Sequence, residues 1–156
     1  MLLSEIFDNT FSTVRTHWSG DMGQFELDGY TYYINFMRLS SNDVIHQTAP
    51  PNSPMSKNTY FIGFAAENNE TGELTDEETN LGNSIQVFSI ILNEIKKRVH
   101  QTNADILYFG NYKGSKKEPL YRKLIRKYAV NGWEVHSEYD SRFNGQPIHT
   151  WILVRN

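Results

Sequence analysis

The sequence from residue 84 to residue 101, SIQVFSIILNEIKKRVHQ, contains the clearest helix signal of this chain. Its apolar residues recur at spacings of three and four, which places them on one side of a helix. They are Ile85, Phe88, Ile91, Leu92, Ile95 and Val99. The spacing predicts a long helix over residues 84–101 that buries one broad apolar stripe.

The segments on either side of this helix read as strands. Tyr60–Ala66 is almost entirely apolar, which is typical of a strand covered on both faces, and Ala104–Phe109 is a shorter apolar run. Two strands joined by one helix and short links pair in parallel through a right-handed crossover. Pro119 then suits the first turn of a second helix, which ends at Asn131-Gly132. We therefore expect a central strand–helix–strand–helix unit.

Hairpins flank this unit. Asp28-Gly29 between residues 24–27 and 30–37 is a strong hairpin signal, and residues 133–138 and 148–154 read as two closing strands around Asn144-Gly145. A short helix is expected at residues 2–7 and a strand at 11–18. A turn is expected at 110–114 and a long proline-containing loop at 39–58. The fold class predicted is α+β: one domain over residues 1–156, with a mixed, mainly antiparallel sheet, a central parallel pair and helices on both faces.

Composition excludes several classes of function. The 156 residues contain no cysteine, so a disulfide framework, a thiolate metal site and a cysteine nucleophile are excluded. The formal net charge of -3 argues against general nucleic-acid binding. No apolar run approaches the roughly 20 residues of a membrane span, so a cytoplasmic protein with no membrane association is expected. The five histidines lack metal-ligand spacing, and no metal site is expected.

The order of elements, together with particular residues, resembles the GNAT acetyltransferase superfamily. The likeness covers residues 30–154 and is best over 61–133. Thr79-Asn80-Leu81-Gly82-Asn83-Ser84 resembles the loop through which the family's central strand enters its long helix, and Leu120-Tyr121-Arg122-Lys123-Leu124 resembles the start of its later helix. Gly132-Trp133 stands where the family has Gly-Phe, about seven residues later than in that pattern. The resemblance implies a GNAT-like fold and acetyl-CoA as the cofactor.

The resemblance assigns the pyrophosphate of acetyl-CoA to the helix entrance at Leu81, Gly82, Asn83 and Ser84. A helix start offers unpaired amides and a partial positive charge, and glycine permits close approach of a phosphate. The loop departs from the family because it has a single glycine and lies next to six acidic residues between Glu67 and Glu78. A plain helix cap by Asn80, Asn83 or Ser84 is the alternative interpretation.

The resemblance also suggests catalytic residues. Tyr121 is similar to the tyrosine that protonates the departing CoA thiolate in many family members, and Glu67 is the candidate base for the acceptor amine, with His149 as another. Each has a structural alternative: Tyr121 as a core aromatic, Glu67 and His149 as structural or solvated side chains.

The chain also resembles a class of small, uncharacterised bacteriophage proteins, through Gly82-Asn83, Val87-Phe88-Ser89, Ile106–Phe109 and Leu120–Leu124 in that order. Seven basic residues between Lys113 and Lys127 contrast with the acidic segment 67–78, and the two make the molecule a dipole. Two hypotheses follow. The first is a phage-encoded, acetyl-CoA-dependent N-acetyltransferase; the second is a non-catalytic protein of the same scaffold that binds a host protein or a second copy of itself.

Overall fold

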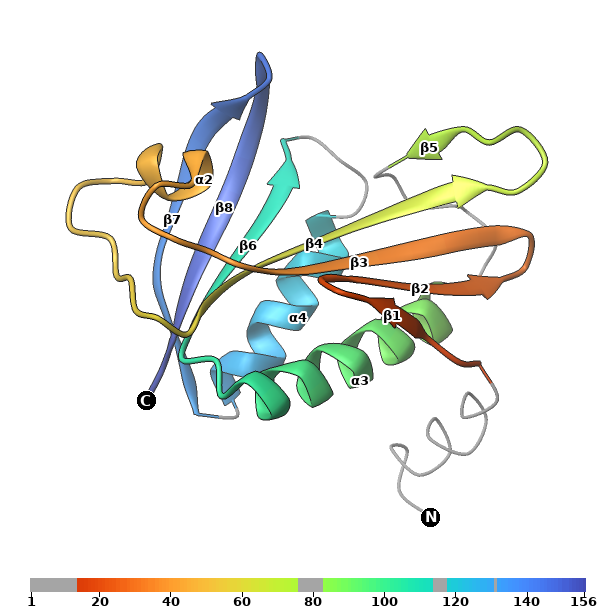
Figure 1. The fold of residues 1–156 in the computed structure, drawn as a ribbon, viewed down its shortest axis with the longest axis horizontal. Helices are drawn as coiled ribbons and strands as arrows, with labels where there is room; N and C mark the ends of the chain where they lie inside the picture. Colours follow the sequence, from red (N-terminus) through yellow and green to blue (C-terminus); the bar gives the residue numbers. More distant parts are fainter. Residues whose placement is uncertain (1–13, 76–82, 114–117, 131) are drawn as a thin grey trace.

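The computed structural model describes residues 14–75, 83–113, 118–130 and 132–156. One mixed sheet in the order β1-β2-β3-β4-β6-β8-β7, with β5 paired to β4, forms the centre of the molecule (Figure 1). The elements are β1 (His17–Ser19), β2 (Met22–Leu27), β3 (Tyr30–Arg38), α2 (Val44–Gln47), β4 (Thr59–Asn68), β5 (Leu74–Thr75), α3 (Ser84–Thr102), β6 (Ile106–Tyr112), α4 (Glu118–Val130), β7 (Trp133–Phe143) and β8 (Gln146–Arg155).

The predicted parallel pair is confirmed. Thr59–Ile62 of β4 pairs in parallel with Ile106–Phe109 of β6, and α3 connects the two strands. Every other strand pair in the sheet is antiparallel. The α+β class with a mainly antiparallel sheet and a central parallel pair is therefore observed.

Different segments of the chain pack against the two faces of the sheet. On one face, alternate residues of the strands, such as Ile34, Ile62 and Leu107, pack with the apolar sides of α3 and α4. On the other face, a smaller cluster around Tyr108 and Ile152 is covered by the segment that contains α2. Helices thus lie on both faces, the two long ones together on one face (Figure 1). The predicted loop over residues 39–58 contains the single turn of α2, which periodicity did not indicate.

The helix α3 has the predicted extent, but one residue of the predicted stripe is wrong. Ile95 is fully buried, whereas Ile85 is 59% exposed. At 100° per residue Ile85 lies at one edge of the predicted stripe, next to Leu92. The buried residues Val87 and Ile90 lie beyond the opposite edge, so the buried side of the helix is rotated away from Ile85.

The hairpins form around the predicted turns. Asp28 and Gly29 both have positive φ (52° and 82°), as do Asn144 and Gly145 (50° and 80°), which is the backbone that a two-residue hairpin needs. The closing strands are longer than predicted. The predicted turn at residues 110–114 is wrong in its first half, because Gly110–Tyr112 continue β6 and pair with β8.

The start of the chain is described only in part. Of the strand expected over residues 11–18, only His17 and Trp18 belong to β1, while residues 14–16 are not in a strand and residues 11–13 lie outside the described residues. The helix expected at 2–7 also lies outside the described residues. Within the described part of the chain, no helix has the length and apolar character needed to cross a membrane.

Candidate functional site

The parallel strands β4 and β6 separate beyond Ile62 and Phe109. Pairing stops there, although β4 continues to Asn68 and β6 to Tyr112. The ring of Phe61 lies across this point: a Cβ added to Gly110 would lie 2.7 Å from it, and one added to Gly63 would lie 3.2 Å from it. Glycine at these two positions therefore lets an aromatic ring lie flat against both strands where they separate.

Tyr121 reaches this separation from α4. Its hydroxyl oxygen accepts a hydrogen bond from the backbone N–H of Phe64 at 3.2 Å, and its side chain is only 2% exposed. Its ring packs against those of Phe64 (centroids 5.0 Å apart) and Trp151 (6.0 Å apart). Tyr121 is thus a buried core aromatic, as its structural interpretation predicted, and its role as the acid stays a prediction.

The free edge of β4 at the separation is short. The strand β3 pairs with one edge of β4 along its length, so β6 and β5 share the other edge. The strand β5 pairs with Ala66 and Glu67, which leaves residues 63–65 facing the separation. The acidic segment therefore begins as a β-hairpin arm.

A cavity of about 340 Å³ opens at this point, on the face of the sheet that α2 covers. Side chains of β3, β4, β6 and β8, together with Ile45 and Thr48 of the α2 segment, line it, and Phe64 and Tyr121 lie at the strand separation. Its volume is near the lower end of the about 300–1,000 Å³ that small-molecule pockets occupy. The cavity could hold a small ligand beside the Tyr121 hydroxyl.

Glu67 contacts this cavity only through another residue. Tyr33 lines the cavity, and its hydroxyl donates a 2.7 Å hydrogen bond to Glu67 Oε2, while Glu67 itself is not a lining residue. That hydrogen bond raises the pKa of Tyr33 above its ordinary value. The sequence analysis did not identify Tyr33 as a site residue. The alternation that predicts β3 gives the face of the strand on which Tyr33 lies, and the register between β3 and β4 puts Glu67 on the same face.

The predicted phosphate site is described only at its end. Leu81 and Gly82 lie outside the described residues, and α3 begins at Ser84. Asn83 occupies the N-cap position without a side-chain cap; its amide nitrogen donates to Asp28 Oδ2 at 2.9 Å instead. The interpretation of Asn83 as a capping side chain is therefore wrong, and the phosphate site at Leu81, Gly82, Asn83 and Ser84 stays a prediction.

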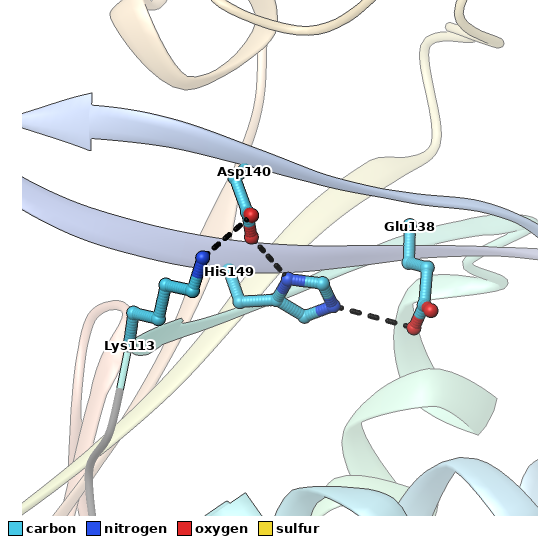
Figure 2. A network of polar contacts seen from close by, with 4 residues as sticks. All are labelled: Lys113, Glu138, Asp140 and His149. Atoms are coloured by element: carbon cyan, nitrogen blue, oxygen red, sulfur yellow. Dashed lines mark hydrogen bonds and ion pairs between the residues drawn. The ribbon is translucent and has the colours of Figure 1, made fainter.

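His149 lies on β8, as predicted, in a network of charged side chains (Figure 2). Its Nδ1 is 2.5 Å from Asp140 and its Nε2 is 3.2 Å from Glu138, while Lys113 pairs with Asp140 at 2.9 Å. The hydrogen bond with His149, followed by that from Lys113, lowers the pKa of Asp140. Both ring nitrogens of His149 lie within hydrogen-bond distance of carboxylates, so neither nitrogen faces an open position where an acceptor amine could bind. His149 is also not among the residues that line the cavity.

No protein-family model matches the sequence, and no curated protein matches it. Several solved structures are similar in outline. A GNAT-family acetyltransferase from Bacillus anthracis is 12% identical, with a TM-score of 0.45 over 86% of this chain and 66% of that one. The acetyltransferase of Bacillus subtilis in complex with CoA is 17% identical, with a TM-score of 0.40 over 97% and 84%. NAA60 of Arabidopsis thaliana in complex with acetyl-CoA is 15% identical, with a TM-score of 0.42 over 99% and 83%. At these identities the chemistry of this chain has to be argued from its own residues.

Proposed function

We propose that this chain is an acyltransferase that takes an acetyl group from acetyl-CoA at the separation of β4 and β6 and transfers it to an amine. One observation carries the proposal: the Phe64 N–H and the Tyr121 hydroxyl meet at that separation, directly beside a cavity. A hydrogen-bond donor on a strand edge and a phenol next to it are the groups that thioester aminolysis requires.

The donors at this site fit an acyl thioester. When bound, acetyl-CoA supplies an activated acetyl group. The N–H of Phe64 would donate to the acyl oxygen in place of the Tyr121 oxygen, and the Tyr121 hydroxyl would donate its proton to the leaving sulfur. The phosphates are assigned to Leu81, Gly82, Asn83 and Ser84 on the resemblance alone.

Glu67 would act as the base through Tyr33. The amine passes a proton to the Tyr33 oxygen as the Tyr33 hydroxyl proton moves to Glu67 Oε2, so that Tyr33 remains neutral throughout. The raised pKa of Tyr33 is consistent with this role, because it disfavours a free phenolate.

Calorimetric titration with acetyl-CoA tests the proposal. We expect the wild type and Tyr121→Phe both to bind acetyl-CoA. The rate of acetyl transfer should be reduced about 100-fold or more in Tyr121→Phe, and not in the control variant. Tyr128→Phe is the matched control, since Tyr128 is a buried tyrosine two turns further along α4 whose hydroxyl has no hydrogen-bond partner in the described structure. Absence of heat at millimolar acetyl-CoA, together with absence of a thermal shift, would contradict the proposal.

A second candidate is a non-catalytic protein that binds a host protein, in keeping with the bacteriophage resemblance. It is favoured by the edge of β4, where Tyr121 already satisfies the Phe64 N–H and β5 already pairs with Ala66 and Glu67. For this candidate the acidic segment is the binding surface. Exchange of Glu73, Asp76, Glu77 and Glu78 for serine should then abolish recovery of a host protein from bacterial lysate, and unchanged recovery would contradict the role of the segment.

A further inference from the structure

We propose that a groove between the last turns of α3 and α4 binds a small organic phosphate, with the phosphate on basic side chains and an apolar body on the floor of the groove. The groove has a volume of about 300 Å³. Side chains of α3 and α4 line it together with Trp133 at the start of β7 and Arg155 at the end of β8. Figure 1 shows that the ends of these four elements lie close together. The inference does not depend on the proposed acyltransferase function.

The groove lies away from the proposed acetyl-CoA site. That site is at the strand separation beyond Ile62 and Phe109 and at the start of α3. The groove instead takes its α3 residues from Leu92 to the C-cap, Asn103. The 19 residues of α3 place its two ends about 28 Å apart at 1.5 Å per residue. A ligand in the groove therefore occupies a second site.

Basic side chains surround the groove, and this charge is the first argument for an anion. Lys96 and His100 come from α3, Lys127 from α4 and Arg155 from β8, and all four residues are exposed. Among the described residues that line the groove, none is a carboxylate. Within the described part of the chain, neither Lys96 nor Arg155 forms an ion pair with a carboxylate. The groove therefore concentrates positive charge, which attracts an anion.

Arg155 is held in the groove by uncharged groups. Its Nη1 donates to Asn103 Oδ1 at 3.4 Å, and its Nη2 donates to the backbone carbonyl of Ala104. The guanidinium also lies 5.1 Å from the centre of the Trp133 ring. These contacts orient the guanidinium without neutralising its charge. Since a guanidinium has five N–H donors, others remain for the oxygens of a phosphate.

The basic side chains of α3 are not needed to cap the helix. The last carbonyl groups of α3 accept hydrogen bonds from the backbone, because the N–H of Asn103 donates to His100 and the N–H of Ala104 donates to Val99. The end of the helix is thus satisfied by its own chain. The charges of Lys96 and His100 are therefore available to a ligand.

The floor of the groove is apolar, and it selects for an organic phosphate. Val99, Tyr128 and Trp133 are buried, and Leu92 is half-buried. The rings of Tyr128 and Trp133 meet edge to face, with their centroids 5.6 Å apart. A hydrocarbon or aromatic body on this floor is stabilised by burial, which inorganic phosphate does not gain. A volume of about 300 Å³ suits a small molecule.

An NMR titration measures this binding and locates it. With ¹⁵N-labelled tryptophan the protein gives three indole signals, and Trp133→Phe identifies that of Trp133. The probes are phenyl phosphate, inorganic phosphate, which has no apolar body, and benzyl alcohol, which has no phosphate. We expect phenyl phosphate to bind about tenfold or more tightly than either of the others. It should shift the Trp133 signal more than those of Trp18 and Trp151, whose side chains do not line the groove.

Matched double variants connect the binding to the basic side chains. Lys96→Gln with Lys127→Gln should weaken phenyl phosphate binding about tenfold, because two charges that face the phosphate are lost. Lys97→Gln with Arg126→Gln removes the same charge from exposed positions of the same two helices outside the groove, and should bind like the wild type. Surface substitutions of this kind leave the fold intact. Equal affinities of the two double variants would overturn the inference, as would equal binding of phenyl phosphate and either of the other probes.

A competition with acetyl-CoA separates this site from the proposed acetyl-CoA site, since that molecule also carries phosphates. We expect phenyl phosphate to bind with unchanged affinity at saturating acetyl-CoA. Displacement of phenyl phosphate by acetyl-CoA would mean that the phosphates of acetyl-CoA occupy the groove, and would overturn the inference. Binding of phenyl phosphate by a protein that fails to bind acetyl-CoA would support the inference and contradict only the proposed function.

Discussion

Removal of the Tyr121 hydroxyl should destabilise the fold through the hydrogen bond that it accepts from Phe64. In Tyr121→Phe the N–H of Phe64 loses its partner while the ring remains in place. An unsatisfied buried donor costs about 1–3 kcal/mol. The neighbouring cavity can admit water to this N–H, which favours the lower part of that range. We therefore expect a loss of about 1–2 kcal/mol in the free energy of unfolding.

Urea denaturation measures this loss, with Tyr128→Phe as the control. For a chain of this size a slope of about 2 kcal/mol/M converts the loss to a midpoint about 0.5–1 M lower than that of the wild type. Tyr128→Phe removes a buried hydroxyl without a hydrogen-bond partner in the described structure, so its midpoint should stay the same or rise. A Tyr121→Phe midpoint equal to that of the wild type, or a larger loss in Tyr128→Phe, would refute the assignment of the Phe64 N–H to Tyr121.

Three further predictions concern the core, the strand separation and the charged network. On α3, Ile95→Ala should cost about 2–5 kcal/mol in unfolding free energy and Ile85→Ala less than about 0.5, because the first residue is fully buried and the second is 59% exposed. Gly110→Ala should cost about 1–3 kcal/mol, since its Cβ would lie 2.7 Å from the ring of Phe61, which must move. Asp140→Asn should reduce the loss of stability at acid pH. The pKa of Asp140 is lowered in the folded state from its ordinary value of 3.8. Its contacts therefore stabilise the fold fully above pH 3.8, and this stabilisation is lost as the pH falls below 3.8.

Each of these predictions has a clear contrary result in urea denaturation. Equal costs at the two isoleucines would contradict the orientation of α3. A Gly110→Ala midpoint equal to that of the wild type would contradict the position of the Phe61 ring. An identical fall in midpoint between pH 5 and pH 3 for the wild type and Asp140→Asn would mean that the network does not stabilise the folded state.

The central part of the fold could be predicted because its signals are local. The 84–101 periodicity gives α3, the apolar run at 60–66 gives β4, and Asp28-Gly29 gives the β2–β3 hairpin, since each depends on the spacing of neighbouring residues. The lengths of the two closing strands, β7 and β8, could not be predicted from the spacing of neighbouring residues. Asp140, Ser141 and Arg142 of β7 are polar, with exposed or half-buried side chains, and these residues extend the strand because of their pairing with β8.

The candidate site was predictable only in part, because its contacts join distant segments. Tyr121 was found through the resemblance, but its partner Phe64 is 57 residues away in the sequence. Tyr33 and Glu67 are 34 residues apart, and only the β3–β4 register brings them to one face. The engagement of His149 with two carboxylates likewise depends on the pairing of β7 with β8. Periodicity identifies the elements but does not pair residues across strands.

The most direct test of the account follows the backbone amide of Phe64 during a titration with acetyl-CoA. The protein is labelled with ¹⁵N at its nine phenylalanines, and Tyr121→Phe identifies the Phe64 signal because that variant removes its hydrogen-bond acceptor. The account predicts that acetyl-CoA shifts the Phe64 amide signal in the wild type more than the signal of Phe25, which lies on β2, two strands away from β4 in the sheet. A Phe64 signal that does not move at saturating acetyl-CoA would contradict the proposal that this N–H receives the acyl oxygen.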